Sequence, residues 1–566
     1  MEPGLLRRRL LRLPFLLAAA ALAANPSADP EAPGFGFWAG RPDRELEASL
    51  LEGMSDLEAL GQVFMIGYVG TEPSAELLHW IRSRNLGGVK IFTRNVQTLE
   101  GLARAVRRMQ EEALRTRLAI PLLVATDQEG GWVRHIKAET SRSPGNLALG
   151  AGGLPRDALL TGYYLGRELR ALGINMNFAP TVDLYSNPSA SVIGPRAFSS
   201  DPQTTALLAL AYFKGMEASG VISTAKHFPG HGRADRDSHG ALPVVPIDLE
   251  ELWERELLPY RILIGEGLPA VMSAHLAYPR ILGDLTPSSR SPYLIEELLR
   301  RRMGFQGLLI TDDMEMSGAL QGGLDVPQAC LQALRAGTDI VLVSHTPRLQ
   351  DQTWTRLAER INRDPDFRLR VRESAGRVLR QKLRTFREAR FPLLPSLDLR
   401  GSIPAPGAAE FFAGAAARAV TLVREGRIPY KPRSGERVLL AGQFEEFLAE
   451  GKRRIPGAET LKFSYSPFYS ARPEDKRRLA AEVPDFDTVI FCLANYNSLE
   501  VLQELKPWAD RLIVISALSP VYLAEVPWVA SCLAVYGTEA ASFRAGFAAL
   551  AGDFRPMGRL PIELAR

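Results

Sequence analysis

Short apolar runs alternate with longer amphipathic stretches between residues 43 and 390. Runs that fit strands occupy residues 63–68, 88–92, 122–127, 176–183, 222–228, 270–276, 307–312 and 340–344. The stretches between them repeat apolar residues at helical spacing, as in residues 74–84, 102–116, 156–172, 203–219, 295–303 and 326–336. This alternation predicts a (β/α)8 barrel of the TIM type with insertions, although a doubly wound sheet uses the same alternation.

The polar residues in this region favour the barrel. Ionisable side chains stand at or just past the ends of five predicted strands: Asp127, Asp183, Lys226 with His227, His275 and Asp312. In a barrel the carboxyl ends of all strands meet on one face, where active sites lie. We therefore expect these side chains to converge on one pocket.

A second unit follows the predicted barrel of residues 43–390. Residues 391–407 are rich in proline and arginine and are expected to form a linker. Residues 408–566 combine a helical segment at 408–420 with strand-like runs at 438–440, 488–493, 512–516 and 533–536. This pattern predicts a smaller αβα sandwich domain without a catalytic cluster.

The first residues are typical of an export signal. Arginines precede an apolar stretch of about a dozen residues, which is short for a membrane span. We expect a signal peptide at residues 1–24 and a linker at 25–42, with the mature protein periplasmic or secreted. An uncleaved anchor is the alternative, and no later segment predicts a transmembrane helix.

Charge and cysteine content narrow the class of protein. Across 566 residues, 68 basic and 64 acidic side chains give a net charge of +4, which does not support nucleic-acid binding. The three cysteines, in no CxxC spacing, are expected to be buried small hydrophobes and not a disulfide framework. Nothing in the composition indicates an oligomeric state.

The densest cluster of candidate chemistry lies at residues 226–239, where three of the seven histidines fall within fourteen residues. A zinc site is one interpretation, but the spacing of these histidines matches no usual zinc pattern. A structural loop is another. We favour acid/base catalysis, because Asp237 stands two residues before His239 and can fix its tautomer and raise its basicity.

Two carboxylates end the apolar run of residues 307–312. Asp312 is a candidate nucleophile, but Asp313 follows it directly. Adjacent strand residues point to opposite faces, so one of the two is expected to face the pocket, and periodicity does not say which. Both carboxylates could instead cap the next helix.

A third group combines a carboxylate with cationic side chains. Asp127 precedes two glycines, Arg134 and His135, and Arg196 follows further along the chain. A carboxylate can accept hydrogen bonds from sugar hydroxyls, and an arginine can donate to a hydroxyl or a carbonyl.

These motifs together resemble glycoside hydrolase family 3, in particular its NagZ-type β-N-acetylglucosaminidases. Residues 226–232 read KHFPGHG, and Asp237-Ser238-His239 follow after four residues, which reproduces the signature KHFPGHGxxxxDSH. The segments at 127–131, 177–180, 196–199, 272–275 and 311–313 continue the resemblance in order, over roughly residues 50–385.

The resemblance implies a retaining exo-β-N-acetylglucosaminidase that needs no cofactor and no metal. It makes Asp312 the nucleophile and His239, supported by Asp237, the acid/base. The implied sugar contacts are Asp127, Arg196, Lys226, His227 and Met316. The family usually reads DQEGGRVxR, whereas this chain has Trp132 and His135 in place of the two arginines. Either Arg134 or His135 is expected to take over the sugar contact.

The implied substrates are carbohydrates that carry terminal β-linked GlcNAc, from peptidoglycan fragments or chitin oligosaccharides. A histidine acid/base avoids a second negative charge beside the nucleophile, so phosphorolysis is an alternative to hydrolysis. A non-catalytic sugar-binding protein on the same scaffold is an alternative from a different class.

Overall fold

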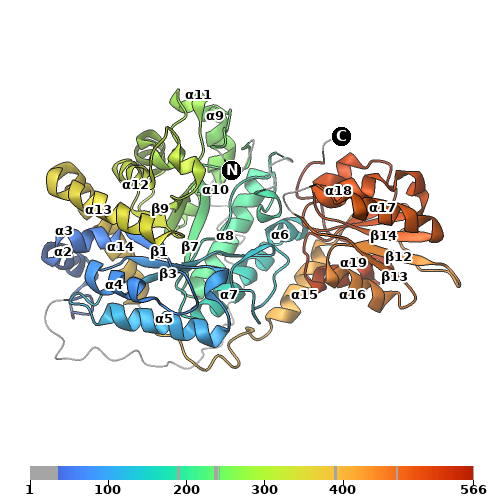
Figure 1. Cartoon of the computed structure of the whole chain (residues 1–566), viewed down its shortest axis with the longest axis horizontal. Coiled ribbons are helices and arrows are strands. Elements are labelled where there is room, and N and C mark those ends of the chain that lie inside the picture. Colours follow the sequence, from blue (N-terminus) through green and yellow to red (C-terminus); the bar gives the residue numbers. More distant parts are fainter. Residues whose placement is uncertain are drawn as a thin grey trace.

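The computed structural model describes residues 36–187, 192–234, 240, 242–387, 392–466 and 470–564. The predicted signal peptide therefore lies outside the described residues. Two bodies of secondary structure follow one another along the chain (Figure 1). None of the described helices is long and apolar enough to cross a membrane.

The first body is a closed barrel of eight parallel strands in the order β1-β10-β9-β8-β7-β6-β3-β2, which confirms the predicted TIM-type fold. The strands are β1 (Phe64–Gly67), β2 (Gly88–Ile91), β3 (Leu123–Thr126), β6 (Met176–Asn177), β7 (Ile222–Phe228), β8 (Ala270–Ser273), β9 (Leu308–Asp313) and β10 (Ile340–Val343). Their side chains are almost all buried, as expected for parallel strands covered by helices.

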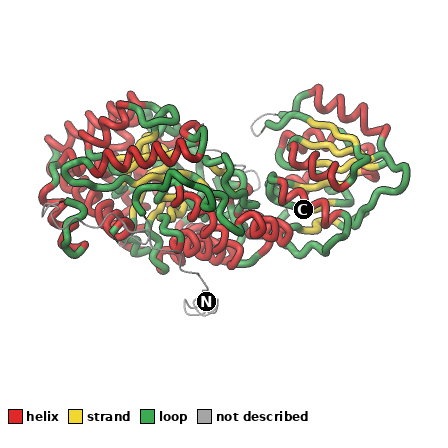
Figure 2. The backbone as a smooth tube through the Cα atoms, turned by 90° about the horizontal axis from the view of Figure 1, so that it is seen from below, coloured by secondary structure: helices red, strands yellow, loops and turns green. Residues whose placement is uncertain are grey.

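Helices surround the barrel strands (Figure 2). The longer ones are α2 (Asp43–Gly53), α4 (Ala75–Arg84), α5 (Leu99–Leu114), α7 (Pro155–Ala171), α8 (Pro202–Ala218), α10 (Leu257–Gly265), α12 (Val326–Arg335), α13 (Pro347–Arg363) and α14 (Pro365–Phe386). The short helix α3 (Asp56–Gln62) lies next to β1, and the short helix α6 (Asn146–Gly152) lies next to the second domain. The helix predicted at 295–303 is a π-helix, Tyr293–Arg302.

The strand predicted at residues 176–183 is wrong in its length. Only Met176 and Asn177 form β6, and the chain then continues irregularly beside β7, with a single bridge between Thr181 and Lys226. Pro180 has no backbone N–H to donate, which interrupts the strand ladder at this point. The segment still places Asp183 at the end of the barrel where β7 ends, next to His227.

The second body is a six-stranded sheet in the order β11-β16-β15-β14-β12-β13. Its strands are β11 (Thr421–Arg424), β12 (Val438–Gly442), β13 (Glu459–Lys462), β14 (Thr488–Leu493), β15 (Leu512–Ser516) and β16 (Cys532–Ala534). Sequence patterning missed the edge strands β11 and β13, in which most side chains are not buried. All three cysteines are buried and free, as expected.

Separate apolar cores cover the two faces of this sheet. One contains side chains of α16 (Glu445–Arg454) and α19 (Ala540–Leu550), and the other contains side chains of α17 (Pro473–Glu482) and α18 (Tyr496–Gln503). With α15 (Ala408–Ala419) leading in from the barrel, this is the predicted αβα sandwich (Figure 1).

The two bodies are in direct contact. The hydroxyl of Ser199 donates to the Pro561 carbonyl at 2.6 Å, and the hydroxyls of Tyr185 and Ser519 lie 3.0 Å apart. An apolar cluster shared by both bodies includes Leu147 from α6 and Tyr536. The sandwich therefore packs on loops that follow β3 and β6, at the end of the barrel where the predicted site residues lie.

Candidate active site

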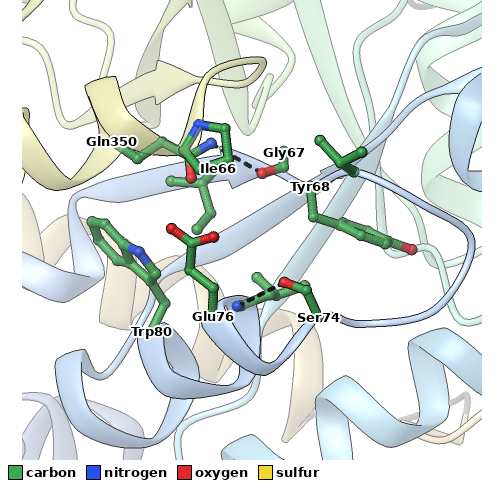
Figure 3. A pocket seen from close by; sticks show the side chains of 10 residues that line it. Ile66, Gly67, Tyr68, Ser74, Glu76, Trp80 and Gln350 are labelled. Atoms are coloured by element: carbon green, nitrogen blue, oxygen red, sulfur yellow. Dashed lines mark hydrogen bonds between the residues drawn. The ribbon is translucent and has the colours of Figure 1, made fainter.

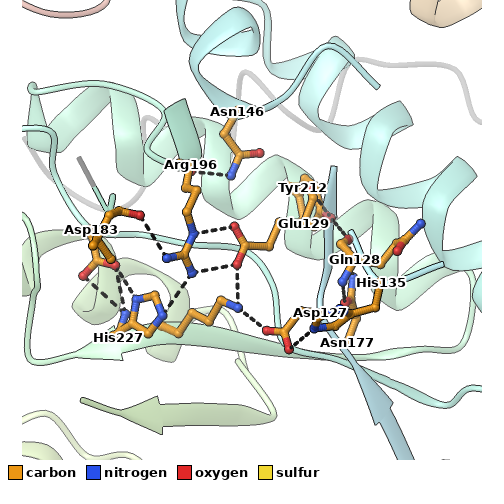
Figure 4. A network of polar contacts seen from close by, with 12 residues as sticks. Asp127, Gln128, Glu129, His135, Asn146, Asn177, Asp183, Arg196, Tyr212 and His227 are labelled. Carbon is orange, nitrogen blue, oxygen red and sulfur yellow. Dashed lines mark hydrogen bonds and ion pairs between the residues drawn. The ribbon is translucent and has the colours of Figure 1, made fainter. Parts of the chain in front are cut away.

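Three barrel strands bring a lysine–carboxylate network together. The Lys226 ammonium in β7 lies 2.5 Å from Asp127 and 2.6 Å from Glu129, and Figure 4 labels both carboxylates. The Lys90 ammonium in β2 lies 2.7 Å from Asp127. Burial acts to raise the pKa of Asp127, but Lys226 and Lys90 hold it well below its usual range. Asp127 is therefore a fixed anion between two cations.

Arg196 extends this network on its other side. Its guanidinium makes a two-pronged contact with the Glu129 carboxylate, at 2.8 and 3.0 Å, which is the strong bidentate geometry. Burial acts to raise the pKa of Glu129, but Arg196 and Lys226 lower it to about 2. Arg196 also lies 3.2 Å from the Nε2 atom of His227.

His227 is oriented by the buried Asp183. Its Nδ1 atom lies 2.7 Å from an Asp183 oxygen, and Asp183 also accepts the backbone N–H of His231 at 2.6 Å. An ionised carboxylate only accepts, so the Nδ1 atom of His227 donates to Asp183. Both ring nitrogens of His227 are held by charged partners.

Asp312 and Asp313 occupy different surroundings at the end of β9. Asp313 is 6% exposed, and its carboxylate contacts Ser344, His345 and the backbone N–H of Glu315. Asp312 is partly exposed, and the hydrogen bond that its carboxylate accepts comes from the backbone N–H of Asp313 at 2.8 Å. Asp313 is thus a structural carboxylate, and Asp312 has capacity left for a ligand.

The charge on Asp312 is stabilised from across the barrel. Burial acts to raise its pKa, but His227, His275 and Lys90 together lower it to about 2. His275 also fixes the backbone: its Nε2 atom lies 3.0 Å from the Asp313 carbonyl, while its Nδ1 atom faces the Ser289 hydroxyl at 2.8 Å. Asp312 is therefore ionised near neutral pH and held in place, as a nucleophilic carboxylate must be.

Arg134 and His135, the two side chains expected to replace the family's sugar-binding arginine, lie in different surroundings. His135 lies with Nε2 3.5 Å from Asp127 and with Nδ1 3.2 Å from the Thr93 hydroxyl. Arg134 is near Glu446 and Glu539 of the second domain, and its NH1 atom has no hydrogen-bond partner among the described residues. His135 is therefore the one that joins the network.

Comparison with known proteins agrees with this architecture. The model of the Glycosyl hydrolase family 3 N terminal domain matches residues 56–381, which is more than half of the chain. The chain belongs to glycosyl hydrolase family 3. This membership confirms the resemblance seen in the sequence and makes the protein a glycoside hydrolase that acts on O-glycosyl bonds.

Relatives of this family 3 chain include curated and solved proteins. It is 36% identical over 284 residues to Beta-hexosaminidase A of Pseudoalteromonas piscicida, and this match covers 47% of each protein. It is 36% identical over 296 residues to a Beta-hexosaminidase of Stenotrophomonas maltophilia, covering 51% of the chain and 85% of the relative. A solved family 3 beta-N-acetylglucosaminidase from Paenibacillus sp. str. FPU-7 is 29% identical with a TM-score of 0.84, covering 90% of this chain and 99% of that one.

Three other predicted residues are not placed in the network of the family 3 site. Met316 is buried at 8% exposure, just before the 3-10 helix Ser317–Leu320, and makes no described contact with the network. Asp237 and His239 lie outside the described residues. The described residues contain no group of three or more side chains that could hold a metal ion.

The network contains two residues that sequence analysis did not assign. Lys90 stands inside the buried strand Gly88–Ile91, and Glu129 is 1% exposed beside Arg196 and Lys226. A lysine within an apolar strand is itself a signal, because an unpaired charge is too costly to bury. Glu129 could not be recognised, since its partners are far away in sequence.

A separate cavity of about 90 Å³ lies outside this network, between the end of β1 and helices α4 and α13 (Figure 3). Its lining includes Tyr68, Glu76, Trp80 and Gln350, and the Gln350 amide donates to the Gly67 carbonyl at 3.0 Å. None of the predicted site residues lines it. We therefore take the network around Asp127 and Asp312 as the candidate active site.

Proposed function

We propose that this family 3 protein is a retaining exo-β-N-acetylglucosaminidase with Asp312 as its nucleophile. The observation that carries the proposal is the different use of the two adjacent carboxylates. Asp313 is engaged by Ser344, His345 and Glu315, whereas Asp312 is ionised and accepts only a backbone hydrogen bond among the described contacts. The names of the curated relatives and of the Paenibacillus structure support the choice of sugar.

The reaction proceeds in two steps. The Asp312 carboxylate attacks the anomeric carbon and the bond to the leaving oxygen breaks, while His239 donates a proton to that oxygen. Water, deprotonated by His239, then attacks the anomeric carbon of the glycosyl–Asp312 ester and releases GlcNAc. The role of His239, with Asp237 as its partner, rests on the sequence motif.

The network beside Asp312 binds the sugar before the reaction. Asp127 is held as an anion by Lys226 and Lys90, so it can accept hydrogen bonds from sugar hydroxyls. His135 and Arg196 border it and can donate. These groups are fixed by ion pairs before the substrate arrives, so little reorganisation is needed when it binds.

The natural substrates that we propose are peptidoglycan fragments or chitin oligosaccharides, which an exported enzyme would meet outside the cytoplasm. The export itself rests on the N-terminal pattern of residues 1–24.

The test identifies the product that the purified protein first forms from a chromogenic β-N-acetylglucosaminide. NMR follows the configuration of this product in buffers with and without phosphate. We expect β-configured GlcNAc in both buffers. We expect no comparable turnover of the chromogenic β-glucoside that lacks the N-acetyl group. A sugar 1-phosphate would indicate phosphorolysis, an α-configured product would exclude the retaining mechanism, and no turnover would favour a binding protein.

A further inference from the structure

An exposed tryptophan stands at the turn beside the candidate active site. Trp132 connects strands β4 (Gln128–Gly130) and β5 (Val133–Arg134), and 43% of it is exposed. Family 3 usually has an arginine at this position. A large, partly exposed ring next to a sugar site is a candidate ligand surface, because ligand sites are preferentially lined by aromatic side chains.

The hairpin that carries Trp132 is fixed to the network. The backbone N–H of His135 donates to the Asp127 carbonyl at 3.0 Å, which closes the hairpin at its base. Gly131 has a φ of +57°, and a side chain there would come within 2.7 Å of the Gly145 Cα atom. Three residues span at most about 10 Å, so the Trp132 backbone lies within that distance of His135.

The second domain completes the aromatic surface. The Tyr465 ring lies 5.6 Å from the Trp132 ring in an edge-on arrangement at 62°, and the Phe444 ring lies 5.3 Å from the Tyr465 ring. The Arg134 guanidinium, next to Trp132, lies near Glu446 and Glu539 of the second domain. Two aromatic rings, one from each domain, thus meet where the barrel contacts the sandwich.

We propose that Trp132 and Tyr465 form a platform for the sugar on the leaving-group side of the scissile bond, an inference that rests on the proposed function. A β-linked pyranose has hydroxyls around its rim and C–H groups on its faces, so it can lie against an aromatic ring while its rim takes hydrogen bonds. The sandwich domain then contributes directly to substrate binding.

The test compares two substrates that share the nucleophilic step. Chitotriose places sugars on the leaving side, whereas N-acetylglucosaminyl fluoride leaves nothing there to stack. We expect Trp132→Ala to lower kcat/KM for chitotriose about tenfold, mainly through KM, and to change kcat/KM for the fluoride less than twofold. Tyr465→Ala should act in the same direction, and Trp132→Phe should keep most of the chitotriose activity.

Tyr293→Ala is the matched control, because Tyr293 is 40% exposed on the π-helix Tyr293–Arg302 and should affect neither substrate. Equal losses on chitotriose and the fluoride, or no loss on chitotriose, would overturn the platform. A wild-type protein that cleaves neither substrate would overturn the proposed function itself, so the two failures are distinguishable.

Discussion

Lys226 and Asp127 form an ion pair of 2.5 Å inside the barrel, although 99 positions separate them in the chain. Burial acts to lower the pKa of Lys226, but Asp127 and Glu129 raise it, so the ammonium keeps its charge. The pair shows how β3 and β7 deliver charge from distant segments to one end of the barrel. Lys226 also compensates the charge of two carboxylates, Asp127 and Glu129, that would be costly to bury alone.

Replacing this lysine should therefore damage both stability and activity. We expect Lys226→Met to lower the free energy of unfolding by about 3–5 kcal/mol, because it leaves buried carboxylates uncompensated. Urea denaturation followed by tryptophan fluorescence measures this change.

Lys382→Met is the matched control for that substitution. Lys382 is also fully buried, but its described partner is the amide oxygen of Gln62 at 2.8 Å, and burial holds its pKa well below the usual range. Removing it leaves no buried charge but does leave the Gln62 amide oxygen without this donor, so we expect a smaller loss, of about 1–3 kcal/mol. Equal losses for both variants would contradict the ion-pair account.

The hairpin pair Arg134 and His135 gives a second prediction. His135→Ala should raise KM for small N-acetylglucosaminides about tenfold, because it removes a donor beside Asp127. Arg134→Ala should leave that KM nearly unchanged, since its guanidinium lies near Glu446 and Glu539. Steady-state kinetics with the chromogenic substrate decide between them, and the reverse ranking would assign the sugar contact to Arg134.

The acid/base role of His239 makes a third prediction. We expect His239→Ala to lose activity on chitobiose by at least a hundredfold, because the sugar alcohol needs a proton to leave. Glycosylation of the enzyme by a dinitrophenyl glycoside should be nearly unaffected, since that leaving group departs as an anion. Pre-steady-state measurement of dinitrophenol release tests this, and an equal loss on both substrates would argue against the role.

A buried carboxyl outside the reaction predicts the pH dependence of stability. Glu256 is 1% exposed, its oxygens have no hydrogen-bond partner in the described structure, and burial together with Asp183 raises its pKa to about 8. The folded state therefore retains a proton that the unfolded state loses above its ordinary pKa of 4.5. This stability is fully present below pH 4.5 and is lost as the pH rises towards 8.

Glu256→Gln should remove that dependence and flatten the stability profile between pH 5 and 8, where the wild type loses about 1.4 kcal/mol per pH unit. Glu254→Gln, an exposed neighbour, should keep the wild-type slope. Thermal denaturation across this range provides the comparison, and parallel slopes for wild type and Glu256→Gln would show that Glu256 is ionised in the fold.

Much of the barrel could be predicted from sequence because its strands are short and almost wholly apolar. Strand β7 matches its predicted bounds, whereas β6 ends early at a segment containing Pro180. The edge strands of the sandwich, Thr421–Arg424 and Glu459–Lys462, carry polar, partly exposed side chains and give no alternating signal.

The candidate site could be predicted in part. The ends of the strands indicated Asp127, Lys226 and Asp312, since any side chain there reaches the same face. The ion pairs of Glu129 depend on partners brought together by the closure of the barrel, which no local pattern records. Periodicity also could not distinguish Asp312 from Asp313. Their roles differ because Ser344 and His345 contact Asp313 and not Asp312.

The most direct measurement traps the covalent intermediate. A 5-fluoro-N-acetylglucosaminyl fluoride slows release of the sugar from the enzyme, so the adduct can be located by peptide mapping and mass spectrometry. We predict one fluoroglycosyl adduct on Asp312, which is absent from Asp312→Asn, and a loss of at least a thousandfold in turnover by that variant. An adduct on Asp313, or an Asp312→Asn variant that keeps substantial activity, would contradict the assignment of Asp312 as the nucleophile.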